Sequence, residues 1–229
     1  MRPKHFVTLL VLLALAVPAS PAHASGIVSV CDEAHLLTAL SGGGTVTFTC
    51  SGTITLTVEI TIAADTTIDG SGQTITVSGN HRVGVFLVNS GVTLNLNSLT
   101  IANGYAIGYG GGIYNDGTVS VSNSNFRTNS ATNSGGGIYN DRGRVTVSSS
   151  NFYGNWAGEG DGGGIFSRIG SLTVSNSAFS DNSTNNDSNG GGIGNYGGTV
   201  EVNNSIFSGN SGGCGSGIYS NNSMLTVRN

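Results

Sequence analysis

Hydrophobic residues recur at regular intervals along the second half of this 229-residue chain. The most regular mark is a Gly-Gly-Ile or Ser-Gly-Ile segment, whose isoleucines are spaced 25, 27, 28 and 25 residues apart. These isoleucines are Ile113, Ile138, Ile165, Ile193 and Ile218. Around them, apolar residues alternate with polar ones at the period of two that is typical of strands. The pattern predicts a repeat protein built from short strands and tight turns.

Two further marks keep step with the isoleucines. An apolar-x-apolar pair occurs in every repeat, at Val119/Val121, Val145/Val147, Leu172/Val174, Val200/Val202 and Leu225/Val227. A Phe-x-x-Asn segment recurs at Phe126/Asn129, Phe152/Asn155, Phe179/Asn182 and Phe207/Asn210. Because one repeat is too short to bury an apolar face alone, successive repeats are expected to stack and share a core. Three strands and three turns in about 25–28 residues predict one rung, meaning one winding of the chain, of an all-β, single-stranded right-handed parallel β-helix.

The asparagines and glycines of these marks have predicted roles of their own. The Phe-x-x-Asn asparagines fall at turns, where their amides are expected to bond to the backbone and to one another as a ladder. The glycines are expected where a Cβ atom would clash with the neighbouring rung or where the backbone needs a positive φ.

The first half of the chain shows a looser version of the pattern. Strand-like pairs occur at Ile54/Leu56, Ile60/Ile62, Ile75/Val77, Val85/Leu87 and Leu94/Leu96. Residues 32–40 are expected to form a short amphipathic helix with Ala34, Leu37 and Leu40 on one face, and this helix would cap the first rung. We therefore expect an N-terminal cap at residues 25–52 and a β-helix at residues 53–229. The pattern stops within a rung at Asn229, which predicts either a truncated chain or an open end covered by a partner or a further domain.

Residues 1–24 have the features of a secretory signal peptide. Arg2 and Lys4 precede an apolar run at residues 6–17, and Ala22-His23-Ala24 offers a cleavage site. The run is too short to span a bilayer, and no later stretch is longer, so the mature chain is expected to have no transmembrane segment. We expect a protein that is secreted or held at the cell surface.

The three cysteines fit an exported protein. Cys31 and Cys50 flank the predicted helix and the strand after it, and we expect a disulfide between them. Cys214 remains unpaired in this scheme and is predicted to be a small buried residue in place of a glycine.

Composition and charge exclude several fold classes and one class of partner. The chain has 38 glycines but only 9% charged residues and 3 prolines, which excludes a coiled coil and a collagen-like helix. The formal net charge is −4, and the arginines do not cluster beyond Arg142 and Arg144, so no nucleic-acid partner is expected.

One outward-facing column carries candidate chemistry. If the isoleucines point inward, Tyr114, Tyr139 and Phe166 stack on the outside, and Asp116, Asp141 and Arg168 lie two residues further along the same face. Aromatic faces beside carboxylates and a guanidinium suit sugar binding, and stacked carboxylates suit Ca²⁺. The alternative is purely structural, since stacked aromatics stabilise neighbouring rungs and Asp after Asn is ordinary in turns.

The repeats also resemble a known family. Gly-Gly-Gly-Ile-Tyr-Asn at residues 110–115 and 135–140, followed by Phe-x-x-Asn, resembles the repeats of the polymorphic outer-membrane protein family and of bacterial secreted right-handed parallel β-helix proteins in general. The resemblance covers about residues 53–229, with Gly-Gly-Gly-Ile where the family usually has Gly-Gly-Ala-Ile. It implies an extracellular β-helix that serves in adhesion or surface display, and it transfers no catalytic residue.

Three functional hypotheses follow. The first is a non-enzymatic module for adhesion, display or glycan binding, with a polysaccharide or surface glycan as its partner and no cofactor except optional Ca²⁺. The second is a polysaccharide lyase or glycoside hydrolase that uses Asp116, Asp141 and Arg168, residue types that resemble the sites of β-helical pectate lyases. The third is an ice-binding solenoid, suggested by Thr45/Thr47, Thr53/Thr55 and Thr74/Thr76, although these pairs do not continue through the later rungs.

Overall fold

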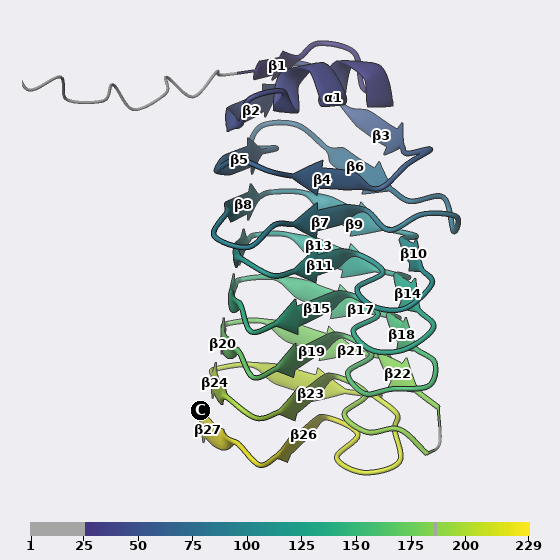
Figure 1. Cartoon of the computed structure of the whole chain (residues 1–229), viewed down its shortest axis with the longest axis vertical. Coiled ribbons are helices and arrows are strands. Elements are labelled where there is room, and N and C mark those ends of the chain that lie inside the picture. The colour runs from purple at the N-terminus through teal and green to yellow at the C-terminus, as the bar shows by residue number, and fades with distance from the viewer. Residues whose placement is uncertain (1–25, 186) are drawn as a thin grey trace, which may run out of the picture.

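The computed structural model describes residues 26–185 and 187–229, and the predicted signal peptide at residues 1–24 lies outside this part. The described chain forms a parallel β-solenoid of about seven rungs with a single short helix at its N-terminal end (Figure 1). The predicted all-β parallel solenoid is thereby confirmed, while its right-handed sense stays a prediction. No helix in the described part is long and apolar enough to cross a membrane.

Four parallel sheets run along the solenoid. Sheet A contains β1 (Gly26–Val28), β2 (Gly44–Phe48), β5 (Thr66–Asp69), β8 (Thr93–Asn97), β12 (Thr118–Ser122), β16 (Arg144–Ser148), β20 (Ser171–Ser175), β24 (Thr199–Asn203) and β27 (Met224–Arg228). Sheet B contains β3 (Gly52–Thr55), β6 (Ile75–Ser78), β9 (Thr100–Ala102), β13 (Asn125–Arg127), β17 (Asn151–Tyr153), β21 (Ala178–Ser180) and β25 (Ile206–Ser208). Sheet C contains β4 (Ile60–Ile62), β7 (Phe86–Val88), β11 (Ile113–Asn115), β15 (Ile138–Asp141), β19 (Ile165–Arg168), β23 (Ile193–Tyr196) and β26 (Ile218–Asn221). The shorter sheet D contains β10 (Tyr105–Ala106), β14 (Ser130–Ala131), β18 (Trp156–Ala157) and β22 (Ser183–Thr184).

The register places equivalent residues of successive rungs directly over one another. On sheet C, Ile113 pairs with Ile138, and Ile138 pairs with Ile165. On sheet B the phenylalanine rings of neighbouring rungs stack at 4.7–4.9 Å with interplanar angles of 7°. Phe126, Phe152 and Phe179 are fully buried. The predicted inward columns are therefore confirmed, and they form one continuous core.

Buried asparagines form the predicted ladder beside the phenylalanines. The Nδ2 of Asn155 donates to the Oδ1 of Asn182 at 2.8 Å and to the Phe126 carbonyl at 2.9 Å. Its Oδ1 accepts from the backbone N–H and the Nδ2 of Asn129. These amides are completely buried, so the partners in adjacent rungs supply the hydrogen bonds that burial would otherwise forfeit.

The Gly-Gly-Ile motif is explained by close approach between rungs. A Cβ on Gly137 would collide with the carbonyl oxygen of Gly164, and a Cβ on Gly164 would collide with that of Gly192. Only glycine fits where one backbone passes so near the next.

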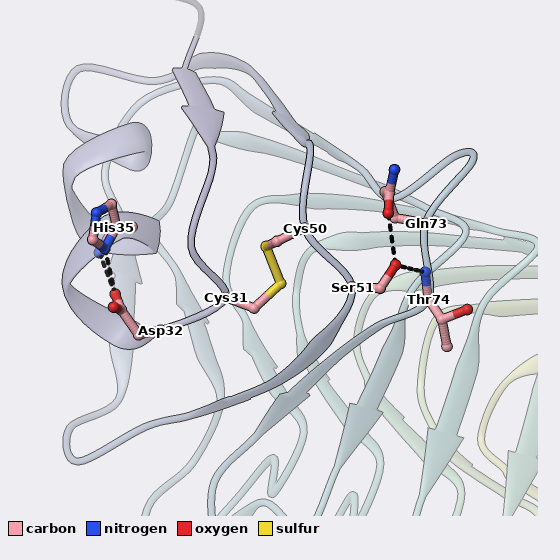
Figure 2. The surroundings of a disulfide bond; sticks show 7 residues. All are labelled: Cys31, Asp32, His35, Cys50, Ser51, Gln73 and Thr74. Carbon is pink, nitrogen blue, oxygen red and sulfur yellow. Dashed lines mark hydrogen bonds and ion pairs between the residues drawn. A yellow bond between two sulfur atoms is a disulfide. The ribbon is translucent and has the colours of Figure 1, made fainter.

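The N-terminal cap consists of β1, α1 (Glu33–Leu40) and the following strands, closed by the predicted Cys31–Cys50 disulfide (Figure 2). The Asp32 side chain caps α1 by accepting from the His35 backbone N–H at 2.9 Å. The predicted helix is confirmed, but its predicted buried face is wrong. Leu36 and Ala39 are buried, whereas Leu37 is 40% exposed. The helix turns this face inward because Ala39 packs directly on Gly26, where a Cβ would clash.

Two further expectations are wrong. Cys214 is exposed rather than buried. Backbone hydrogen bonds place it in a loop column after Ser134, Asp161 and Asn189, in the last rung of the described chain. In β7 the inward residues are Phe86 and Val88, so Leu87 faces outward and does not share a face with Val85 as the sequence pattern predicted.

Phe152→Ala is expected to lower the free energy of unfolding by about 3–5 kcal/mol, because it opens a cavity in the stacked phenylalanine column. Urea denaturation measures the loss. Tyr153→Ala is the control, since Tyr153 follows in the same strand and is 53% exposed. Equal stability of the two variants would contradict the stacked core.

Candidate functional site

The predicted aromatic column exists but is largely covered. The rings of Tyr114, Tyr139 and Phe166 stack at 5.3 and 5.6 Å on the outside of sheet C. Tyr139 and Phe166 are only 4% and 8% exposed, however, and the ring of Tyr109 lies 4.5 Å from that of Tyr139. Burial raises the pKa of Tyr139 to about 12. The expectation that all three rings form an open sugar platform is therefore wrong, and only Tyr114 remains partly exposed.

The charged residues of the column do not converge on one point. Arg168 binds buried Asp141 through two hydrogen bonds, Nε to Oδ1 at 3.0 Å and a terminal nitrogen to Oδ2 at 3.1 Å. Asp116 is exposed at the following turn. Within the described residues, no group of three or more His, Cys, Asp and Glu side chains is placed to hold a metal ion.

A groove of about 490 Å³ lies beside Tyr114. We call it the Glu59 groove and define it by Glu59, Arg82, Leu87, Tyr105, Tyr109 and Tyr114. Leu87 and Tyr114 are neighbours in register on sheet C and face outward. Tyr105 and Tyr109 approach from the loop that precedes β11.

The groove forms because the outline of the solenoid changes between two rungs. The connection that leads into β7 spans residues 79–85 and contains no strand, whereas the connection into β11 spans residues 103–112 and contains β10. Sheet D therefore begins at β10, as Figure 1 shows. In the described part of the chain no strand pairs with β10 on its N-terminal side, where the Tyr105 backbone N–H donates to the Val83 carbonyl at 2.8 Å. The connection at residues 103–112 consequently overhangs a narrower rung. Its Ile107 and Tyr109 side chains are 89% and 43% exposed.

Glu59 is the acidic residue of the groove, and its carboxyl group is partly desolvated. Its carboxylate lies over Gly84, where a Cβ atom would collide with it. Among the described residues, no hydrogen bond or ion pair holds this carboxylate. Burial raises the pKa of Glu59 above its ordinary value of 4.5, because the charged form loses water. A carboxyl group with a perturbed pKa in a groove is a typical feature of a functional site.

A second hollow continues the groove towards the cap. It has a volume of about 370 Å³ and is lined by Leu37, Leu40, Glu59 and Thr61, among others. Thr61 pairs in register with Leu87, and Leu87 pairs with Tyr114. Glu59 therefore lies between two hollows on one side of the solenoid.

Sequence reasoning found Tyr114 but missed the rest of the groove. Glu59, Arg82, Tyr105 and Tyr109 lie in the half of the chain where the repeat marks are weakest. One signal was present: the loop before the first Gly-Gly-Gly-Ile is apolar and aromatic, Tyr-Ala-Ile-Gly-Tyr at residues 105–109. The later loops are mainly polar, with Trp156-Ala157 as the exception.

Comparison with known protein families, with curated proteins and with solved structures finds no significant match for this chain.

Glu59→Gln is expected to stabilise the protein relative to the wild type at pH 7 more than at pH 4. The folded state binds the Glu59 proton more tightly than the unfolded state does, so the wild type loses stability as pH rises from 4.5 towards the raised pKa. The amide removes this loss. Urea midpoints of both proteins between pH 3.5 and 8 give the difference.

Glu33→Gln is the matched control with the opposite sign. The Thr57 backbone N–H donates to Glu33 at 2.7 Å and lowers its pKa, so this carboxylate stabilises the fold above pH 4.5 and the contribution fades as pH falls. A pH-independent difference between Glu59→Gln and the wild type would show that Glu59 is not desolvated.

Proposed function

We propose that this protein is an exported, non-enzymatic glycan-binding module and that the Glu59 groove is its binding site. The observation that carries the proposal is the meeting of three tyrosines with an unpaired carboxyl group and a guanidinium group in one groove. Tyrosine rings present apolar faces on which a sugar ring can stack, while carboxyl and guanidinium groups bind hydroxyls and fix orientation.

Packing explains only part of the aromatic surface of the groove, since Tyr109 contacts Tyr139 but stays open to solvent on its other side. Tyr109 is 43% exposed at the rim, whereas the residues that hold the core are fully buried. Large apolar side chains gathered on an open surface commonly mark a binding site. Their position at a step in the solenoid supports a ligand-binding role in addition to packing.

The hollows on either side of Glu59 favour a polymer over a single sugar. The outward residues Thr61, Leu87 and Tyr114 belong to three consecutive rungs. At the usual strand spacing they span about 10 Å along the solenoid axis. A linear glycan lying along this side would pass Glu59 and reach the tyrosines.

The groove supports binding better than hydrolysis. Most glycoside hydrolases use a pair of carboxyl groups, one on each side of the scissile bond. Glu59 is the one acidic residue that lines the Glu59 groove in the described part of the chain, and Asp141 is engaged by Arg168. A lyase or hydrolase therefore remains the second candidate, favoured only by the raised pKa of Glu59.

Ice binding has less support. Thr45 and Thr47 lie on sheet A, whereas Thr53 and Thr55 lie on sheet B. Along sheet A the column that begins at Thr45 continues through Thr67 to Asn95. On sheet B the column that begins at Thr53 continues through Thr76 and Thr100 and ends at Asn125. These threonine columns therefore cover only two and three rungs.

Export and adhesion complete the proposal. A disulfide and the lack of a membrane-spanning helix among the described residues are compatible with an extracellular protein. The leader-like residues 1–24 and the resemblance to polymorphic outer-membrane protein repeats favour a secreted or surface-displayed adhesin.

Binding to a glycan array, followed by titration calorimetry, tests the proposal. Tyr109→Ala and Arg82→Ala are each expected to weaken binding at least about tenfold, as residues of a binding hot spot do. Tyr153→Ala, an exposed tyrosine on sheet B, is the control and should bind like the wild type. Parallel incubations with and without Ca²⁺ follow the release of reducing ends and unsaturated sugars.

Three results would overturn the proposal. They are the failure of the wild type to bind any glycan, unchanged affinity in Tyr109→Ala, and depolymerisation of the bound polysaccharide, which would make the protein an enzyme.

A further inference from the structure

A third hollow, lined mainly by polar residues, lies near the Glu59 groove, at the edge between sheets C and A. It has a volume of about 450 Å³, and Gly91, Asp116, Arg142, Arg144 and Ile169 contribute to its lining. We call it the arginine hollow. We propose that it binds the anionic group, a carboxylate or a sulfate, of an acidic glycan, which assigns a substrate class to the proposed function and rests on it.

The hollow exists because one turn is shorter than its neighbours. Register pairs Asn115 with Asn140 and Thr118 with Arg144, so two residues connect β11 to β12 where three connect the equivalent positions of the next rung. Register also pairs Val88 with Asn115 and Thr93 with Thr118, so the rung before has four residues there. The short turn at residues 116–117 is therefore recessed between two longer ones.

The additional residue of the longer turn is Arg142, and its backbone is in an unfavourable conformation. Arg142 has φ 57°, and the equivalent residues of the next rungs are Ile169 at φ 55°, Gly197 at 66° and Asn222 at 51°. Glycine and asparagine adopt this left-handed region readily, whereas for other residues it costs about 1 kcal/mol or more of conformational free energy.

The two residues that bear this cost, Arg142 and Ile169, both line the hollow with exposed side chains, as Arg144 and Asp116 also do. Left-handed backbone recurs at turns throughout the described chain, including Thr128 and Ser149. What distinguishes Arg142 and Ile169 is that their side chains line a hollow.

The charges at the hollow favour an anion. Arg142, Arg144 and Arg168 lie in two consecutive rungs, although the whole chain has only eight Lys and Arg residues and a net charge of −4. In the described residues Arg144 has no acidic partner within 4 Å. Arg142 lies 3.8 Å from Asp141, whose two oxygens are already bound by Arg168. The guanidinium groups of Arg142 and Arg144 are therefore available to a ligand.

The residue types fit an acidic sugar better than a simple ion. Guanidinium groups bind carboxylates and sulfates through paired hydrogen bonds. The Asp116 carboxylate, which lines the same hollow from the preceding rung, is suited to hydroxyl groups and would repel a small free anion. A sugar with both an acid group and hydroxyls satisfies both kinds of side chain.

The hollow and the Glu59 groove share one strand. Tyr114 of the groove and Asp116 of the hollow are alternate residues on the outward face of β11 and the turn after it. Alternate residues of a strand are about 6.6 Å apart, which is close to the length of one sugar unit. A glycan chain that follows the solenoid axis to Tyr114 and then turns along β11 can therefore contact both sites.

Titration calorimetry with three probes tests this inference: a galacturonic acid hexamer, a sulfated heparin hexasaccharide and neutral cellohexaose. The test variant combines Arg142→Asn with Arg144→Gln. Because asparagine suits the left-handed backbone, this variant should melt at or above the wild-type temperature. It should bind the acidic probes at least tenfold more weakly and bind cellohexaose with unchanged affinity. Arg127→Gln, an exposed arginine on sheet B, is the control.

The outcomes separate this inference from the proposed function. Unchanged affinity of the double variant for both acidic probes would overturn the arginine hollow and leave the Glu59 groove standing. An equal loss for cellohexaose, or an equal loss in Arg127→Gln, would also overturn it. Acidic binding that depends on Arg142 and Arg144 but survives Tyr109→Ala would support the hollow and overturn the Glu59 groove.

Discussion

Hydrogen bonding and packing between identical positions of consecutive rungs determine what this protein can and cannot vary. Asn155 shows the constraint in one residue, since its amide is completely buried and depends on Asn129, Asn182 and the Phe126 carbonyl. Neither a single rung nor an isolated strand could satisfy that amide. The interior is therefore committed to structure, and the candidate chemistry is found on the outer surface of the rungs.

On that surface, regular stacking also buries side chains that would otherwise be open to a ligand. Tyr139 and Phe166 face outward, yet both are almost completely buried. Tyr139 stacks between Tyr114 and Phe166, and the ring of Tyr109 lies against it. Open sites appear where consecutive rungs differ in length. The Glu59 groove lies where sheet D begins, and the arginine hollow lies where the turn at residues 116–117 is shorter than those on either side. Defects in the repeat, rather than the repeat itself, create the concave surfaces.

This distinction explains what the sequence could and could not predict. The repeat period and the alternation of apolar and polar residues predict the columns of isoleucine, valine and phenylalanine and the asparagine ladder. They do so because equivalent residues of successive rungs must stack. Burial of Tyr139 depends on how a glycine-rich loop folds back, which no period describes. The inward face of α1 depends on the close contact of Ala39 with Gly26, and the raised pKa of Glu59 depends on Gly84, a residue in another rung. Such contacts are tertiary and leave no local pattern.

The N-terminal cap has a consequence beyond covering the first rung. The disulfide joins Cys31 to Cys50, and Asp32 caps the helix that begins at the next residue. Glu33 then accepts hydrogen bonds from the backbone N–H groups of Thr57 and Val58. These bonds fix the two residues that immediately precede Glu59. The segment that presents the unpaired carboxyl group is thus held by the cap from one side and by β4 from the other, which is the rigidity that a pre-organised binding site requires.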